Sequence, residues 1–209
     1  MTDASAMSDL NLLICLIGGY LLGAVPFGLV LTRMAGLGDI RSIGSGNIGA
    51  TNVLRTGHKF LALMTLILDS GKGAIAVGIG YMLEPELGPA IGGTAAFMGH
   101  VFPIWLKFKG GKGVATFLGT LFALNLMIGV IAGLSWLVSA LIFKISSLSA
   151  LIATLVILIV SYFDVLGLAD PSLFPAILAM GALIFWAHRS NIVRILEGDE
   201  PKIGGKKKD

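Results

Sequence analysis

The sequence predicts an all-α polytopic membrane protein with about seven transmembrane helices. Hydrophobic residues make up 56% of the 209-residue chain and charged residues only 13%, whereas a soluble domain carries roughly 25% charged residues. The mean hydropathy is +0.91, and long apolar runs separate the charges, as expected of a chain whose solvent is lipid. This composition excludes a disordered chain, a collagen-like repeat and an ordinary soluble enzyme.

Apolar runs account for most of the chain. A spanning helix needs about 20 mostly apolar residues, and the runs near or above that length are Leu10–Thr32, Phe60–Leu83, Leu87–Leu106, Gly113–Phe143, Ile145–Phe163 and Pro171–Ala187. The fourth run is too long for one crossing, because at about 1.5 Å per residue it exceeds the ~30 Å core by about half. We therefore expect it to cross twice, as two short helices of about 15 residues each. The turn between them is expected near Asn125 to Gly129.

The basic residues predict the orientation. With seven crossings, every Lys and Arg except Lys72 lies on one face of the membrane, including the C-terminal Lys206, Lys207 and Lys208. The opposite face carries Asp3, Asp9, Glu84, Glu86, Asp164 and Asp170. Because cytoplasmic loops are enriched in Lys and Arg, the N-terminus is expected outside and the C-terminus in the cytoplasm. We expect one membrane domain, residues 1–209, with cytoplasmic segments at 38–59, 107–116 and 188–200.

The first cytoplasmic segment combines glycine with small polar residues. The run Gly44-Ser-Gly-Asn-Ile-Gly49 is too flexible for a helix interior and suits a loop whose backbone N–H groups converge on an anion. A glycine nest that opens a helix often holds phosphate, but no Walker Gly-Lys-Ser/Thr follows. The alternative, a merely flexible loop, does not explain the Ser, Asn and Arg. The candidate ligands are Ser45, Gly46, Asn47, Gly49, Thr51, Asn52 and Arg55.

The second and third cytoplasmic segments are also basic and polar. In Lys107-Phe-Lys-Gly-Gly-Lys-Gly113, lysine can pair with phosphate and glycine lets the backbone approach it; the alternative is an anchoring loop whose lysines need no specific partner. His188, Asn191 and Arg194 share one helix face as the last span leaves the membrane. The candidates here are Gly110, Gly111, Lys112, Gly113, His188, Arg189, Asn191 and Glu200.

Polar side chains also occur at membrane depth. Asp69 and Lys72 are i, i+3 neighbours on one predicted helix, and His100 lies in the next span. A lone charge at the bilayer centre costs about 2.5–3.5 kcal/mol, so Asp69 and Lys72 are expected to pair or to face a wet cavity. For His100 we expect a polar contact between helices. All three are candidates for residues that support the site without contacting the substrate.

The chemistry suggested by these segments is phosphate binding without an obvious protein base. The chain lacks the His-x4-Asp pattern, a Gly-x-Ser-x-Gly elbow and a carboxylate cluster for a metal, so we expect neither a metal nor a cofactor. The basic excess indicates membrane orientation and an anionic lipid or substrate, and no nucleic acid is expected. Two other functions stay open from the residues alone: a phosphate or organophosphate transporter, and a scaffold that binds anionic lipid headgroups.

The three segments together resemble the signatures of the bacterial acyl-phosphate:glycerol-3-phosphate acyltransferase family, PlsY, over essentially the whole chain. The resemblance implies a multi-pass enzyme of the bacterial inner membrane with its active site facing the cytoplasm. It implies transfer of a fatty acyl group from acyl phosphate to the 1-hydroxyl of sn-glycerol 3-phosphate, giving lysophosphatidic acid and inorganic phosphate as the first acylation of phospholipid synthesis. It also implies a soluble phosphate acyltransferase that supplies acyl phosphate.

Residue roles follow from the resemblance, position by position. Ser45, Asn47 and nearby loop amides would hold the phosphate of acyl phosphate. Arg55, Lys112, His188 and Asn191 would hold glycerol 3-phosphate and orient its hydroxyl, with Thr51, Asn52, Arg189 and Glu200 as further candidates. The proton of the hydroxyl would pass to a substrate phosphate oxygen or to His188.

Overall fold

The computed structural model describes residues 2–168 and 170–203, without the side chains of residues 2–4 and 166. The expectations for Asp3 and for Lys206, Lys207 and Lys208 lie outside this description. Throughout the described ranges every regular element is helical, as the sequence predicts. The chain divides into two compact units, Met1–Gly129 (unit 1) and Val130–Asp209 (unit 2).

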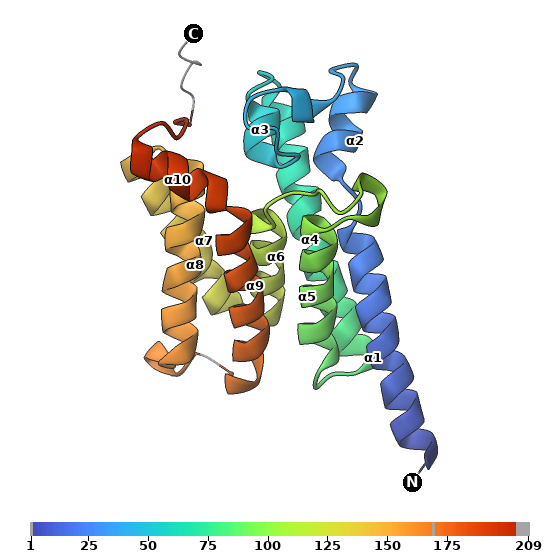
Figure 1. The fold of residues 1–209 in the computed structure, drawn as a ribbon. Helices are drawn as coiled ribbons and strands as arrows, with labels where there is room; N and C mark the ends of the chain where they lie inside the picture. The colour runs from blue at the N-terminus through green and yellow to red at the C-terminus, as the bar shows by residue number, and fades with distance from the viewer. Residues whose placement is uncertain (1, 169, 204–209) are drawn as a thin grey trace. The chain divides into compact units, whose positions relative to one another are not determined.

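Unit 1 contains four long helices and two short polar segments. The helices that pack together are α1 (Thr2–Gly23), α4 (Lys59–Leu83), α5 (Gly88–Val101) and α6 (Val114–Leu124). In Figure 1, α1, α4 and α5 lie side by side. The first polar segment is the connection from α1 to α4, residues 24–58, and contains α2 (Phe27–Met34), the 3-10 turn η1 (Ile40–Ser42) and α3 (Ala50–Leu54). The second is the connection from α5 to α6, residues 102–113, and contains η2 (Ile104–Leu106).

Unit 2 is built on α8 (Ser146–Tyr162) and α9 (Phe174–Ala187), which pack against each other. The short turns η3 (Val165–Gly167) and η4 (Pro171–Leu173) connect them. Helix α10 (Arg189–Glu197) contacts both α8 and α9 and leaves α9 at an angle of 55°, visible in Figure 1. His188 lies at this bend, between the last residue of α9 and the first of α10.

The long apolar run 113–143 is broken where the sequence predicts. Helix α6 ends at Leu124 and α7 (Leu126–Phe143) begins two residues later, so the helices have 11 and 18 residues. Asn125 makes the break, because its Oδ1 accepts the N–H groups of Met127 (3.0 Å) and Ile128 (3.1 Å). An Asn side chain in this position caps the N-terminus of the next helix.

Within the described residues, three helical stretches are long and apolar enough to cross a membrane: Ser5–Met34, Lys59–Leu83 and Leu126–Phe143. The bent pair α9 and α10 makes a fourth if it counts as one span, and α6 and α8 are shorter apolar helices. Many large hydrophobic side chains on these helices are exposed, for example Leu13, Ile67 and Leu141. Such exposure suits a lipid environment and would be unfavourable in water.

Glycine lets the helices of unit 1 approach closely. A Cβ on Gly23 of α1 would collide with the backbone of Ala96 on α5, and one on Gly99 of α5 would collide with the carbonyl of Tyr20. A Cβ on Gly119 of α6 would collide with the Ser70 carbonyl of α4. Small residues at such contacts are typical of helix packing in membranes. Some glycines of the chain therefore serve the close packing of its helices.

Candidate active site

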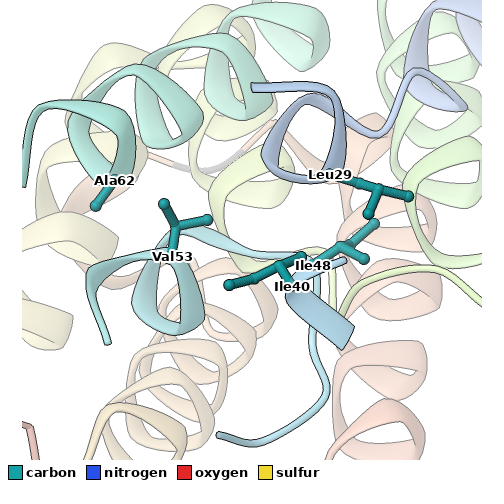
Figure 2. Close-up of a cluster of buried hydrophobic side chains, with 5 residues drawn as sticks. All are labelled: Leu29, Ile40, Ile48, Val53 and Ala62. Carbon is teal, nitrogen blue, oxygen red and sulfur yellow. The ribbon is translucent and has the colours of Figure 1, made fainter. Parts of the chain in front are cut away.

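An apolar cluster supports the first polar segment of unit 1. Leu29, Ile40, Ile48, Val53 and Ala62 bury their side chains together, and Figure 2 shows them coming from α2, η1, the glycine-rich loop, α3 and α4. Burying a side chain of this size stabilises a fold by about 1.5–3 kcal/mol. Leu106, from the second polar segment, packs against the same cluster. The first two segments therefore share one apolar foundation.

Asn52 organises the glycine-rich loop from beneath. Its side chain is 2% exposed, and its Nδ2 group contacts the carbonyl oxygens of Ile40 (3.0 Å), Ile43 (3.0 Å) and Asn47 (2.8 Å). Its Oδ1 accepts the Ser45 N–H at 3.1 Å. One amide thus fixes four backbone groups of the loop, which indicates that Asn52 shapes the site rather than facing a substrate.

Arg55 lies over this loop. Its guanidinium reaches Asn52 Oδ1 at 3.5 Å, confirming the i, i+3 proximity expected from the sequence. Gly44 has φ +58°, and a Cβ there would collide with Asn52 Oδ1 and lie 2.8 Å from Arg55 Cδ. Glycine is therefore required at 44 both by the left-handed backbone and by the Arg55 side chain. Arg55 is exposed and contacts a neutral amide, so its positive charge stays suited to an anion.

Two backbone N–H groups of the predicted anion nest already donate within the loop. The Ser45 N–H donates to Asn52 and the Gly46 N–H donates to the Ile43 carbonyl at 3.0 Å, so these two amides hold the loop together and do not face a phosphate. The Ser45 side chain lies on the exposed part of the loop, Asn47 and Thr51 are half-buried, and Gly49 precedes α3 as its N-cap.

Two other arginines of this region are paired. Arg33 and Arg41 both bind Asp39, at 3.0 Å and 2.5 Å. The hydrogen bonds from the Arg41 side chain and backbone, helped by Arg33, hold the pKa of Asp39 well below its usual range. One carboxylate of the protein thus engages both arginines and offsets one of their two charges, whereas Arg55 contacts a neutral amide.

The second polar segment folds back onto the end of α5. The N–H groups of Gly110 and Gly111 donate to the carbonyls of Val101 (3.1 Å) and His100 (3.0 Å). A Cβ on Gly110 would collide with the His100 carbonyl, one on Gly111 with the His100 ring, and one on Gly113 with the Phe97 ring. The sequence explained these glycines by a substrate's approach; the structure gives each a packing reason. Lys112, half-buried, stands between two of them.

Asp69, Lys72 and His100 form a buried cluster beneath this second segment. The Nζ of Lys72 lies 2.9 Å from Asp69 Oδ1, 2.7 Å from His100 Nδ1 and 3.1 Å from the Val25 carbonyl. The side chains of Asp69, Lys72 and His100 are between 1% and 4% exposed. The expected Asp69–Lys72 pair and the expected interhelical contact of His100 are both confirmed. The sequence did not predict that one ammonium joins them.

In unit 2, Glu200 organises the third segment. Its carboxylate accepts hydrogen bonds from Ser147 (2.6 Å), Asn191 (2.5 Å) and Arg194 (2.7 Å). Burial alone would raise the pKa of Glu200, but these hydrogen bonds outweigh it and hold the pKa below its ordinary value. Beyond Glu200, the Ile203 N–H donates to the carbonyl of Lys144, which lies just before α8, at 2.7 Å. Sequence reasoning missed Ser147, because no pattern links positions 147 and 200.

His188 and Arg189 differ in their surroundings. His188 is 2% exposed, and its Nδ1 lies 2.8 Å from the Ile184 carbonyl oxygen. A carbonyl only accepts, so Nδ1 carries the proton, and in the neutral form of the ring the lone pair is on Nε2. Arg189 is exposed, lies 4.3 Å from the Trp186 ring centre and donates to the Trp186 carbonyl.

The helical fold and the basic, glycine-rich segments indicate a membrane protein suited to binding phosphorylated molecules. Comparison with known proteins gives the family: the glycerol-3-phosphate acyltransferase family model matches residues 13–198, and the chain belongs to this family. It is 58% identical over 201 residues to the glycerol-3-phosphate acyltransferase of Paramagnetospirillum magneticum, covering 95% of this chain and 97% of the relative. The Caulobacter vibrioides relative is 53% identical over 211 residues, covering 99% and 94%.

Two solved structures are similar in fold. Both are crystal structures of PlsY (YgiH), an integral membrane glycerol 3-phosphate acyltransferase, in its glycerol 3-phosphate form (TM-score 0.84, 36% identity) and its lysophosphatidic acid form (TM-score 0.82, 35% identity). Each comparison covers 91% of this chain and 94% of the solved chain. The resemblance found in the sequence motifs is thereby confirmed, and the chain is an integral membrane acyltransferase.

Proposed function

We propose that the protein transfers a fatty acyl group from acyl phosphate to the 1-hydroxyl of sn-glycerol 3-phosphate, as the first acylation of phospholipid synthesis. The products are lysophosphatidic acid and inorganic phosphate. Support comes from the family and from the ligands that name the two PlsY structures. The single observation that carries the proposal is the common apolar foundation, through Leu106, of the segments bearing Arg55 and Lys112.

The chemistry asks little of the protein beyond positioning and charge. The glycerol oxygen attacks the acyl carbonyl carbon, a new C–O bond forms, and the bond between that carbon and the phosphate oxygen breaks. Acyl phosphate is a mixed anhydride with a good leaving group, so catalysis rests on orienting the substrates and stabilising the oxyanion and the leaving phosphate. This accounts for a site proposed without a metal or a cofactor.

Residue roles in the proposal follow the family resemblance, except at Asn52 and Glu200, whose contacts give them another role. Ser45 and Asn47 bind the phosphate of acyl phosphate, and Arg55 and Lys112 bind glycerol 3-phosphate; a cationic hydrogen bond contributes roughly 1.5–3 kcal/mol. His188 and Asn191 orient the glycerol hydroxyl. Asn52 and Glu200, first considered as ligands, act by holding the segments in shape.

The hydroxyl proton has two proposed destinations. One is an oxygen of a substrate phosphate. The other is Nε2 of His188, whose lone pair is fixed by the Nδ1 contact to the Ile184 carbonyl. If His188 is the base, His188→Gln lowers turnover at least about 10²-fold and flattens the pH–rate profile. Near-full turnover with an unchanged profile would assign the proton to a substrate oxygen.

The proposal also places the enzyme in the membrane. It crosses seven times as one domain, with the N-terminus outside, the C-terminus inside and the site at the cytoplasmic face of the inner membrane. This orientation follows from the side that carries the Lys and Arg residues, because cytoplasmic loops are enriched in them. A soluble phosphate acyltransferase supplies acyl phosphate. Labelling of single cysteines introduced at positions 86 and 202 in intact cells tests the orientation, and labelling at 202 from outside would overturn it.

The decisive experiment uses purified protein in detergent with acyl phosphate and glycerol 3-phosphate. Phosphate release that requires both substrates and matches lysophosphatidic acid formed is the expected result. Lys112→Ala should lower the rate about 10²-fold or more if Lys112 stabilises transition-state charge, and a loss of about tenfold or less would make it an anchor only. Substrate uptake by sealed vesicles without phosphate release in detergent would favour a transporter instead.

A further inference from the structure

In the buried cluster of Asp69, Lys72 and His100, the Lys72 ammonium has other contacts besides its ion pair with Asp69. Lys72 Nζ forms a salt bridge with Asp69 Oδ1 (2.9 Å) and lies within hydrogen-bonding distance of His100 Nδ1 (2.7 Å) and of the Val25 carbonyl (3.1 Å). These partners come from α4 itself, from α5 and from the break between α1 and α2. One ammonium group thus connects three elements.

One of these connections leads to the second polar segment. His100 receives Lys72 on Nδ1, and Gly111 packs so closely on the opposite side of the ring that a Cβ there would collide with Nε2. The Gly111 N–H also donates to the His100 carbonyl. The orientation of the imidazole therefore sets where Gly111 lies, and Lys112 is the next residue.

Another connection leads to the first polar segment. The Val25 carbonyl lies just before α2, and Gly28 of α2 packs so closely on the Ile48 carbonyl that a Cβ would collide with it. Leu29, on the same helix, belongs to the apolar cluster beneath Asn52 and its loop. Lys72 is thus tied to both segments, to one through His100 and to the other through α2.

We propose that the Asp69–Lys72–His100 cluster is a positioning device that holds the Lys112 segment in register with the first polar segment, a role that rests on the proposed function. Apolar helix packing with small residues permits sliding and rotation, whereas a salt bridge and two directed hydrogen bonds from one ammonium do not. The cluster acts through Gly111 on Lys112 and touches no substrate. Its members are positioning residues, and their loss acts on the geometry of the second segment.

Four variants separate positioning from simple stability. Lys72→Met and His100→Leu remove the directed contacts at similar volume. His100→Asn keeps an acceptor close to the Nδ1 position but lacks the ring edge that packs on Gly111, so it is a partial rescue. Thr120→Val is the matched control, because Thr120 is buried in the same unit on α6 and, in the described part of the chain, makes no hydrogen bond to either segment.

The first measurement is amide hydrogen exchange of a peptide containing residues 107–113 in the detergent-solubilised protein. Lys72→Met and His100→Leu should raise exchange at Gly110 and Gly111 about tenfold, because local opening becomes easier. Thr120→Val should stay near the wild-type rate, and His100→Asn should lie between the wild type and His100→Leu. Unchanged exchange in His100→Leu would overturn the proposal even where thermal stability falls, and this measurement needs no activity.

The second measurement is steady-state kinetics with glycerol 3-phosphate varied. A shift of about 1 Å in a positioned group can lower the rate about 10²-fold, so His100→Leu should lower kcat/KM by about tenfold to 10²-fold, and His100→Asn should restore part of it. In a Lys112→Ala background, His100→Leu should cost less than about twofold more. An equal loss in both backgrounds would overturn positioning through Lys112. Absence of acyl-phosphate-dependent turnover in the wild type would refute the proposed function and leave the exchange result standing.

Discussion

The first and third polar segments are each organised by one side chain, which is neutral in the first segment and charged in the third. In residues 38–55 the organising group is the neutral amide of Asn52, which contacts three carbonyls and accepts one N–H. In residues 188–200 it is the carboxylate of Glu200, which accepts from three side chains. The neutral group leaves the charge of Arg55 available, whereas the carboxylate neutralises Arg194. The difference separates an arginine suited to substrate from one that serves the fold.

The largest expected effect comes from Asn52→Leu, which removes the neutral organising group at similar size. The carbonyls of Ile40, Ile43 and Asn47 lose their shared donor, and each group that stays buried without a partner costs about 1–3 kcal/mol. Turnover should fall about 10²-fold or more, because the Arg55 and Ser45 positions depend on the loop. Steady-state turnover and thermal unfolding measure this change.

Asn52→Asp provides the control for that variant. It keeps the acceptor for the Ser45 N–H but cannot donate to the three carbonyls, so it should lose nearly as much turnover as Asn52→Leu. Wild-type activity in Asn52→Asp would mean that the three carbonyl contacts are dispensable and that the comparison between the two organising groups is wrong.

Glu200→Gln should have a smaller effect. The amide oxygen can still accept from Ser147 and Asn191, but the charged contact to Arg194 is lost, and a hydrogen bond to a charged group contributes about 1.5–3 kcal/mol. We expect a loss of about 1.5 kcal/mol in the free energy of unfolding. Glu197→Gln on the exposed side of α10 is the matched control and should stay within about 0.5 kcal/mol of the wild type. Equal losses in the two variants would contradict an organising role for Glu200.

The two organising groups should also differ in their response to pH, because Asn52 does not titrate. The folded-state pKa of Glu200 is lowered, since hydrogen bonds from Ser147, Asn191 and Arg194 outweigh the opposing effect of burial. Its stabilisation is therefore fully present above its unfolded pKa of about 4.3 and is lost as the pH falls through the lower folded value.

Thermal unfolding of the wild type and Glu200→Gln between neutral pH and about pH 3 tests this expectation. The difference in unfolding temperature between the two proteins should be constant above about pH 5 and should narrow below it. Asp39, whose pKa is also lowered, is present in both proteins, so its contribution cancels. A difference that stays constant to the lowest pH would place the stabilisation elsewhere.

The sequence could predict elements and segments but not which residues organise them. Apolar run lengths predicted the helices and the break at Asn125, and i, i+3 spacing predicted the Asp69–Lys72 pair. The role of Asn52 depends on carbonyls at 40, 43 and 47 that only the folded loop brings together. Gly111 was interpreted as a phosphate contact because a glycine that admits a substrate and one that admits a histidine ring are identical in sequence.

The smallest expected effect comes from Arg189, which the family resemblance suggested as a ligand. Its guanidinium is exposed and rests on the Trp186 ring at 4.3 Å, and an exposed cation–π contact contributes about 0.5–1 kcal/mol. Arg189→Ala should therefore lower turnover less than about fivefold. Trp186→Leu should give a loss of the same size if the two side chains act as one surface contact. A loss at Arg189 that is much larger than at Trp186, with a raised KM for glycerol 3-phosphate, would show that the third segment also keeps an arginine for the substrate.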